Sequence, residues 1–123
     1  MPIRITRLGS PRAKDEGLRL GTVRRPPRGV RKEDYARRDY YDLWLPDLAP
    51  SAKLVARAQQ QWEGFAKAYR REMKAPAAAR LLGLLAALSH HASFSVGCYC
   101  ENEARCHRSI LRELLIEHGA RVA

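Results

Sequence analysis

Cysteine, histidine and arginine side chains are concentrated in one short segment near the C-terminus. This segment contains Cys98 and Cys100, followed by the adjacent residues Cys106, His107 and Arg108. Thiols and imidazoles bind metals, act as nucleophiles and transfer protons, and arginine binds anions. These five residues are therefore the first candidates for a functional site.

The elements predicted around these residues are a strand and the helix that follows it. Phe94, Val96 and Cys98 recur at every second position, which predicts a strand, and residues 106–118 predict a helix that Gly119 ends. Open α/β sheets place ligand sites at the carboxyl ends of their strands, and the N–H groups at a helix N-terminus favour thiolates and anions. We therefore expect a pocket at this junction.

Helical phasing predicts which side chains of the last helix face inward. His107 lies on the apolar side, whereas Arg108 and Arg112 lie opposite. We expect His107 to face the sheet with a hydrogen-bond partner, either as a structural histidine or as part of a site. Arg108 and Arg112 should cover surface unless a neighbouring loop folds over them, and at least one of Cys98 and Cys100 should be buried as a small apolar residue.

Metal binding is the first chemistry that three thiols and an imidazole suggest, since zinc takes such ligands. The spacing argues against it, because the segment lacks the usual pair of cysteines separated by two to four residues. Neighbouring helical residues also point about 100° apart, so Cys106 and His107 should not share an ion. We predict no bound zinc and no other cofactor.

Thiol chemistry and anion binding are the two remaining interpretations. Residues 100–105 resemble the cysteine-to-arginine loop of rhodanese-like sulfurtransferases, but Glu101 and Glu103 oppose a thiolate and the glycine of such loops is absent. In the other interpretation, helix N–H groups, His107 and an arginine hold a phosphate or carboxylate. We favour this anion pocket.

Positive charge is concentrated in the N-terminal third of the chain. The net charge is +10, and residues 1–38 hold 12 Lys and Arg against 4 Asp and Glu. Such a segment attracts polyanions such as nucleic acid, or is simply a solvated basic surface. The rigid loop of Pro26 and Pro27 carries Arg24 and Arg28, which we expect to approach the Cys/His/Arg pocket.

The remaining pattern predicts a single compact α/β domain over residues 1–123, with a short, mainly parallel sheet of about four strands flanked by helices. The predicted strands are residues 3–8, 18–23, 40–45 and 94–98, and the predicted helices are one continuous helix from the N-cap Ser51 to Met73, then 76–88 and 106–118. A right-handed crossover is expected if the last two strands are parallel neighbours.

No stretch has the roughly 20 apolar residues that a membrane span requires, and the N-terminus lacks the apolar core of a signal peptide. We therefore expect a cytoplasmic protein without membrane contact. Three closely spaced cysteines also indicate a local site and not a disulfide framework.

Five segments in chain order carry a recognisable pattern: residues 16–20, 27–30, 44–51, 62–73 and 106–108. In these the chain resembles the YeaO-like family, a domain of unknown function. The resemblance implies a compact α/β domain but no known reaction. Members of that family typically carry an Asp-Arg-Leu-Trp run where this chain has Val23, Arg24, Arg25 and Pro26. This difference would change ligand preference or abolish turnover if the loop borders the pocket.

The sequence thus favours a Cys/His/Arg pocket for a small anionic or phosphorylated ligand, and leaves open whether the pocket is catalytic. The candidate catalytic residues are Cys106, His107 and Arg108, and the candidate ligand-binding residues are Cys98, Cys100, Arg24 and Arg28. The alternatives are a non-enzymatic basic module that docks on nucleic acid or a partner protein, and a Cys/His metal-binding module.

Overall fold

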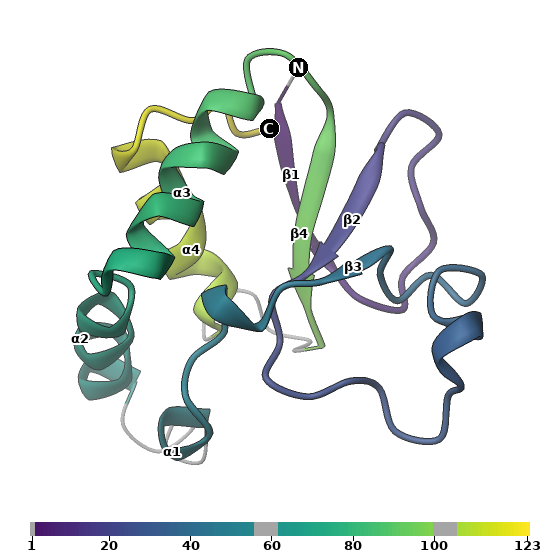
Figure 1. Ribbon diagram of the computed structural model, residues 1–123, viewed down its shortest axis with the longest axis horizontal. Coiled ribbons are helices and arrows are strands. Elements are labelled where there is room, and N and C mark those ends of the chain that lie inside the picture. The colour runs from purple at the N-terminus through teal and green to yellow at the C-terminus, as the bar shows by residue number, and fades with distance from the viewer. Residues whose placement is uncertain (1, 56–61, 100–105) are drawn as a thin grey trace.

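The computed structural model of the protein describes residues 2–55, 62–99 and 106–123 (Figure 1). Its strands are β1 (Ile3–Arg7), β2 (Leu18–Gly21), β3 (Leu43–Trp44) and β4 (Phe94–Cys98). Its helices are α1 (Ala52–Val55), α2 (Trp62–Glu72), α3 (Pro76–Leu88) and α4 (His107–Glu117), and the 3-10 turns η1 (Lys32–Asp34) and η2 (Pro46–Leu48) flank β3.

The four strands form one sheet in the order β1-β4-β2-β3, and every pairing is parallel. This confirms the predicted α/β class and the parallel sheet. The strand predicted over residues 40–45 is reduced to two residues, because only Leu43 and Trp44 pair with β2. A right-handed crossover was expected only if β3 and β4 were neighbours in the sheet. They are not, because β2 lies between them.

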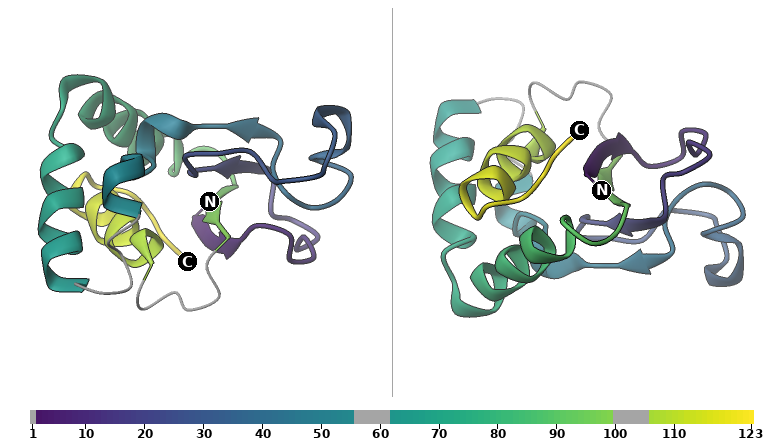
Figure 2. Two further views of the ribbon diagram at one scale, coloured as in Figure 1. Left: turned by 90° about the horizontal axis from the view of Figure 1, so that it is seen from below. Right: turned by 90° about the horizontal axis from the view of Figure 1, so that it is seen from above.

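The α-helices lie on one side of the sheet, and the loop that contains η1 lies on the other (Figure 2). Alternate strand residues face the helices, because side chains of a strand point to opposite faces in turn. Ile3, Leu20, Phe94 and Val96 belong to the core that the helices bury. The strand pattern around Phe94 and Val96 is therefore confirmed.

Polar side chains occupy the opposite face of the sheet, which loops cover. Arg19 and Ser95 are partners in the β2–β4 register, and both contact the buried Glu16. Next to them, the ring of Tyr41 lies directly against Gly21, so closely that any β-carbon at position 21 would collide with the ring. A glycine is therefore required in this strand by the close approach of the loop.

The helix predicted from Ser51 to Met73 is not one continuous helix. Ser51 does cap α1, since the N–H of Leu54 donates to its Oγ at 3.3 Å. However, α1 packs against α2 and is offset from its axis (Figure 1). Residues 56–61 between them lie outside the described residues. The apolar stripe itself is confirmed at Phe65, Tyr69 and Met73, which are buried.

None of the described helices could cross a membrane. The longest, α3, has 13 residues, whereas a spanning helix needs about 20.

Candidate functional site

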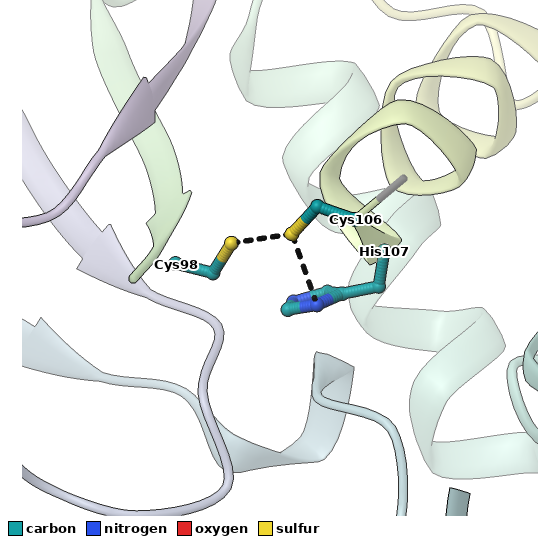
Figure 3. A group of neighbouring side chains, drawn as sticks. All are labelled: Cys98, Cys106 and His107. Atoms are coloured by element: carbon teal, nitrogen blue, oxygen red, sulfur yellow. Dashed lines mark hydrogen bonds between the residues drawn. The ribbon is translucent and has the colours of Figure 1, made fainter. Parts of the chain in front are cut away.

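Cys98, Cys106 and His107 form a buried cluster where β4 ends and α4 begins (Figure 3). The two sulfur atoms lie 2.7 Å apart, and Cys106 Sγ lies 3.8 Å from His107 Nδ1. One donor atom from each of the three side chains lies within 4.8 Å of the others. The structure therefore brings together three of the seven residues predicted for the site.

Cys106 is the N-cap of α4 and lies outside its first turn. Its backbone is extended, with φ −129° and ψ 151°. The 100° rotation between helical neighbours therefore does not separate Cys106 from His107. The angular argument against their sharing an ion therefore does not apply, because it treated Cys106 as helical.

A hydrogen bond to a backbone carbonyl orients the His107 ring. Nε2 lies 2.7 Å from the carbonyl oxygen of Thr22, which can only accept, so Nε2–H is the donor. In the neutral ring Nδ1 is then an acceptor, and this nitrogen faces Cys106. Thr22 is itself held to β4, since both its N–H and its hydroxyl donate to Gly97 O, at 2.9 and 3.0 Å. The inward orientation of His107 is confirmed.

A cavity of about 370 Å³ opens beside the cluster. Cys98 and His107 reach its wall, whereas Cys106 is not among its lining residues. The size is in the range of small-molecule sites. The rest of the lining is mostly apolar, with two arginines: Val23, Arg24, Arg25, Pro50, Ala52, Val55 and Tyr99.

The proline loop contributes one of its two predicted arginines to this cavity. Arg24 Nε donates to Pro50 O and Nη2 to Ala49 O, both at 3.1 Å, so its guanidinium ties the loop to the chain before α1. Arg28 is exposed and is not among the lining residues. The cavity thus includes Arg24 but not Arg28.

Arg25 and Tyr99 also line the cavity, and the sequence analysis missed both as site residues. Arg25 is exposed, and its carbonyl oxygen accepts a 3.0 Å hydrogen bond from the Tyr99 hydroxyl. Burial raises the pKa of Tyr99, so the hydroxyl stays protonated and remains a donor. The position of Tyr99, directly after Cys98, is the sequence signal that could have identified it.

Arg108 is buried, with an exposed fraction of 4%, so the prediction that it covers surface is wrong. The prediction came from helical periodicity, which assumes that the side of the helix opposite the apolar face is exposed to solvent. In the first turn of α4, His107 and Arg108 point in different directions and both are buried. Arg112, one turn later, is exposed as predicted.

Cys100 lies outside the described residues, as do Glu101, Glu103 and the rest of residues 100–105. The rhodanese-like loop expected there is therefore not tested by the structure.

Tyr69 closes the site from the helical side. Its ring meets the His107 ring edge-on at 5.5 Å between centroids, and its hydroxyl donates to Leu48 O at 2.6 Å. Burial, and then negative charge on Cys106 and Cys98, raises the pKa of Tyr69 well above its ordinary value. Tyr69 therefore stays neutral beside the thiols and acts as a fixed packing surface for the imidazole.

A comparison with protein families places the chain in a known group. A family model described as "Active DUF488-N3 subclade" matches residues 3–119. The chain belongs to the DUF488 family. This family includes YeaO-like proteins, so the resemblance seen in the sequence is confirmed. No curated protein matches the chain, and no solved structure does. In this DUF488 protein the buried Cys98, Cys106 and His107 follow β4.

Proposed function

We propose that this DUF488 protein is a thiol-dependent enzyme that acts on a small ligand with an anionic group. One observation carries the proposal: Cys98 lines a cavity while its sulfur contacts Cys106, which lies within reach of His107 Nδ1. A thiol, a base and a group that orients the base form the general pattern of an activated nucleophile.

The contacts define a path for one proton away from Cys98. Cys106 passes its proton to His107 Nδ1, and Cys98 passes its own proton to the sulfur of Cys106. The products are a Cys98 thiolate at the cavity wall and an imidazolium whose Nε2–H still donates to Thr22 O. The N-terminus of α4 favours negative charge on the thiol pair, because Cys106 is the N-cap of this helix and the helix dipole is positive there.

The cavity lining indicates the class of ligand. Val23, Pro50 and Val55 offer apolar contact to the body of a small molecule. Arg25 is exposed at the same cavity and offers a cation for a phosphate or carboxylate. The family description "active" supports an enzyme over a purely structural protein.

Two alkylating reagents that differ in charge test the proposal. Reduced protein with Cys100→Ser, kept in chelator so that no metal is present, is treated with iodoacetate or with iodoacetamide, and the modified cysteine is identified by peptide mass spectrometry. We expect Cys98 to react. The rate ratio of iodoacetate to iodoacetamide should exceed that of a free cysteine peptide about tenfold, equivalent to about 1.4 kcal/mol of anion binding.

Two variants separate the base from the cation. His107→Gln should slow both reagents about 100-fold at neutral pH, the lower end of general-base contributions. Arg25→Gln should remove the preference for iodoacetate, whereas Arg112→Gln, which changes an exposed arginine of α4, should leave it unchanged. Equal rates in wild type and His107→Gln would rule out the proposed thiol activation.

Docking on a polyanion is the second candidate function, and the exposed arginines of the proline loop favour it. Arg24, Arg25 and Arg28 are all exposed within five residues. We propose that these arginines contact nucleic acid. Binding to an oligonucleotide should then weaken steeply with salt and should persist in Cys98→Ser and His107→Gln. Binding that is lost in those two variants would instead assign the anion to the cavity.

A further inference from the structure

We propose that Cys98, Cys106 and His107 form a zinc site whose fourth coordination position opens into the cavity. This inference goes beyond the proposed thiol enzyme, although it uses the same side chains. The zinc-bound and zinc-free states exclude one another, because a sulfur that coordinates zinc is not free to attack a ligand. Zinc would therefore control when the thiols are reactive.

The donor atoms are close to the arrangement that zinc requires. Zinc–sulfur bonds of about 2.3 Å and zinc–nitrogen bonds of about 2.0 Å place tetrahedral donors roughly 3.5–3.8 Å apart. Cys106 Sγ and His107 Nδ1 are already separated by 3.8 Å. The two sulfurs, at 2.7 Å, would part by about 1 Å on binding.

The contact of His107 with Thr22 is the one expected around a metal. A histidine that ligates through one ring nitrogen usually donates its other N–H to a carbonyl or carboxylate, which fixes the ring and its tautomer. Here Nε2–H donates to Thr22 O at 2.7 Å, and Nδ1 faces the sulfurs. The ring is thus oriented for coordination through Nδ1.

Charge and ligand type favour a divalent, thiolate-binding ion such as zinc. All three side chains are buried, with exposed fractions of 2% for Cys98, 1% for Cys106 and 7% for His107. Two thiolates and a neutral imidazole cancel the charge of a divalent ion, so binding buries no net charge. Thiolates exclude calcium and magnesium, which prefer oxygen ligands, and a monovalent copper ion would leave one negative charge uncompensated.

The cavity supplies the open position. Within residues 2–55, 62–99 and 106–123, the donor group comprises only these three side chains. Two of them, Cys98 and His107, also line the cavity of about 370 Å³. Three protein ligands with one exchangeable position are the arrangement of catalytic zinc sites, whereas structural sites hold four protein ligands.

Metal titration of the reduced, chelator-treated protein tests the site directly. We expect one zinc ion per chain and, with cobalt(II) as a probe, the visible absorption of a tetrahedral sulfur-containing site. Thioglycolate, which carries a thiol and a carboxylate, should then change the cobalt spectrum by binding at the open position. An unchanged spectrum would show a closed site and overturn this part of the proposal.

Matched variants identify the ligands. Cys98→Ser and His107→Gln should each lower zinc affinity at least 100-fold, whereas His91→Gln, at an exposed histidine, and Cys100→Ser should not. Loss of zinc in Cys100→Ser would overturn the three-residue assignment. Protection of Cys98 and Cys106 from iodoacetamide by one equivalent of zinc checks the same assignment in the wild-type protein, without any effect of mutation on folding.

Different results would overturn the zinc site and the thiol enzyme. If zinc does not bind but metal-free Cys98 still prefers iodoacetate, only the zinc site is wrong. If zinc binds and Cys98 shows no such preference, only the thiol enzyme is wrong. A Cys98–Cys106 disulfide that persists under reductant would overturn the zinc site, since both ligands would be consumed.

Discussion

Glu16 and Arg19 form a two-pronged ion pair inside the face of the sheet that the loops cover. Arg19 Nε lies 2.7 Å from Glu16 Oε2, and Nη2 lies 2.9 Å from Oε1. Both side chains are buried, with exposed fractions of 0% and 4%. The remaining guanidinium nitrogen of Arg19 donates to the carbonyls of Ser10 and Asp39, so one residue of β2 anchors two loops.

This ion pair makes the free energy of unfolding depend on pH in the acid range. Burial alone would raise the pKa of Glu16, but hydrogen bonds from Arg19, Ser95 and the N–H of Ala13 outweigh it and lower the pKa from 4.5 to about 2. Because the folded pKa is the lower one, the contribution is complete above pH 4.5 and is lost as the pH falls towards 2. Urea unfolding across this range should show the loss.

Glu16→Gln should remove that pH dependence and lower the free energy of unfolding at pH 7 by about 3 kcal/mol, because Arg19 is left buried without its counter-charge. Asp15→Asn is the matched control. Asp15 pairs with Arg4 at 2.9 Å but its side chain is 81% exposed, so we expect a change below about 0.5 kcal/mol. An equal effect of the two substitutions would contradict the assignment.

Gly21→Ala and Gly83→Ala should change stability in opposite directions. A β-carbon at position 21 would collide with the ring of Tyr41, and overpacking of this kind costs about 1–3 kcal/mol. A β-carbon at position 83 in α3 would meet no atom within 4 Å, so alanine should stabilise the helix by about 0.5–1 kcal/mol. Midpoints of denaturant unfolding measure both.

Removing a hydroxyl should also have different effects at two buried tyrosines. Tyr69→Phe leaves the carbonyl of Leu48 without its donor and should cost about 1–2 kcal/mol. The hydroxyl of Tyr41 is buried without a hydrogen-bond partner in the described part of the chain, and burial raises its pKa to about 12. Tyr41→Phe should therefore leave the free energy of unfolding unchanged or raise it, and a clear loss of stability would show that this hydroxyl has a partner.

Thr22→Val tests whether the Thr22 hydroxyl contributes only to stability or also orients His107. The substitution removes the hydroxyl bond to Gly97 O but keeps the backbone carbonyl that holds His107. We expect a loss of about 1 kcal/mol in stability, with the rate of Cys98 alkylation changed less than about twofold. A large fall in that rate would mean that the hydroxyl, which lies 3.5 Å from His107 Nε2, orients the ring.

Local patterns in the sequence were enough to predict β4 and α4, and the succession of helix, strand and helix indicated a parallel sheet. The alternation through Phe94 and Val96 marks the face of the strand that the helices cover, and the apolar stripe through Phe65 and Tyr69 marks the buried face of α2. The inward orientation of His107 was predicted from the helical periodicity of α4. These features depend on residues close in sequence, which is why they could be read without a structure.

Features that depend on distant segments could not be predicted in this way. The extended backbone of Cys106 places its sulfur 2.7 Å from Cys98, and no helical or strand period encodes that conformation. The burial of Arg108 likewise depends on how the end of α4 is packed, and the strand order depends on β4 pairing with both β1 and β2. The contact that brings Arg25 to Tyr99 at the cavity is long-range in the same sense.

The position of β4 between β1 and β2 determines when the chain can fold during synthesis. Among the described strands β1 pairs with β4, apart from a bridge between Ile3 and Val122. The longest pairing of β2 is also with β4, which begins at Phe94. A ribosome adding roughly 5–20 residues per second exposes Ile3 and Leu20 for several seconds before that strand exists. The complete sheet therefore cannot form until β4 has been synthesised, and until then β1 lacks the strand that it pairs with.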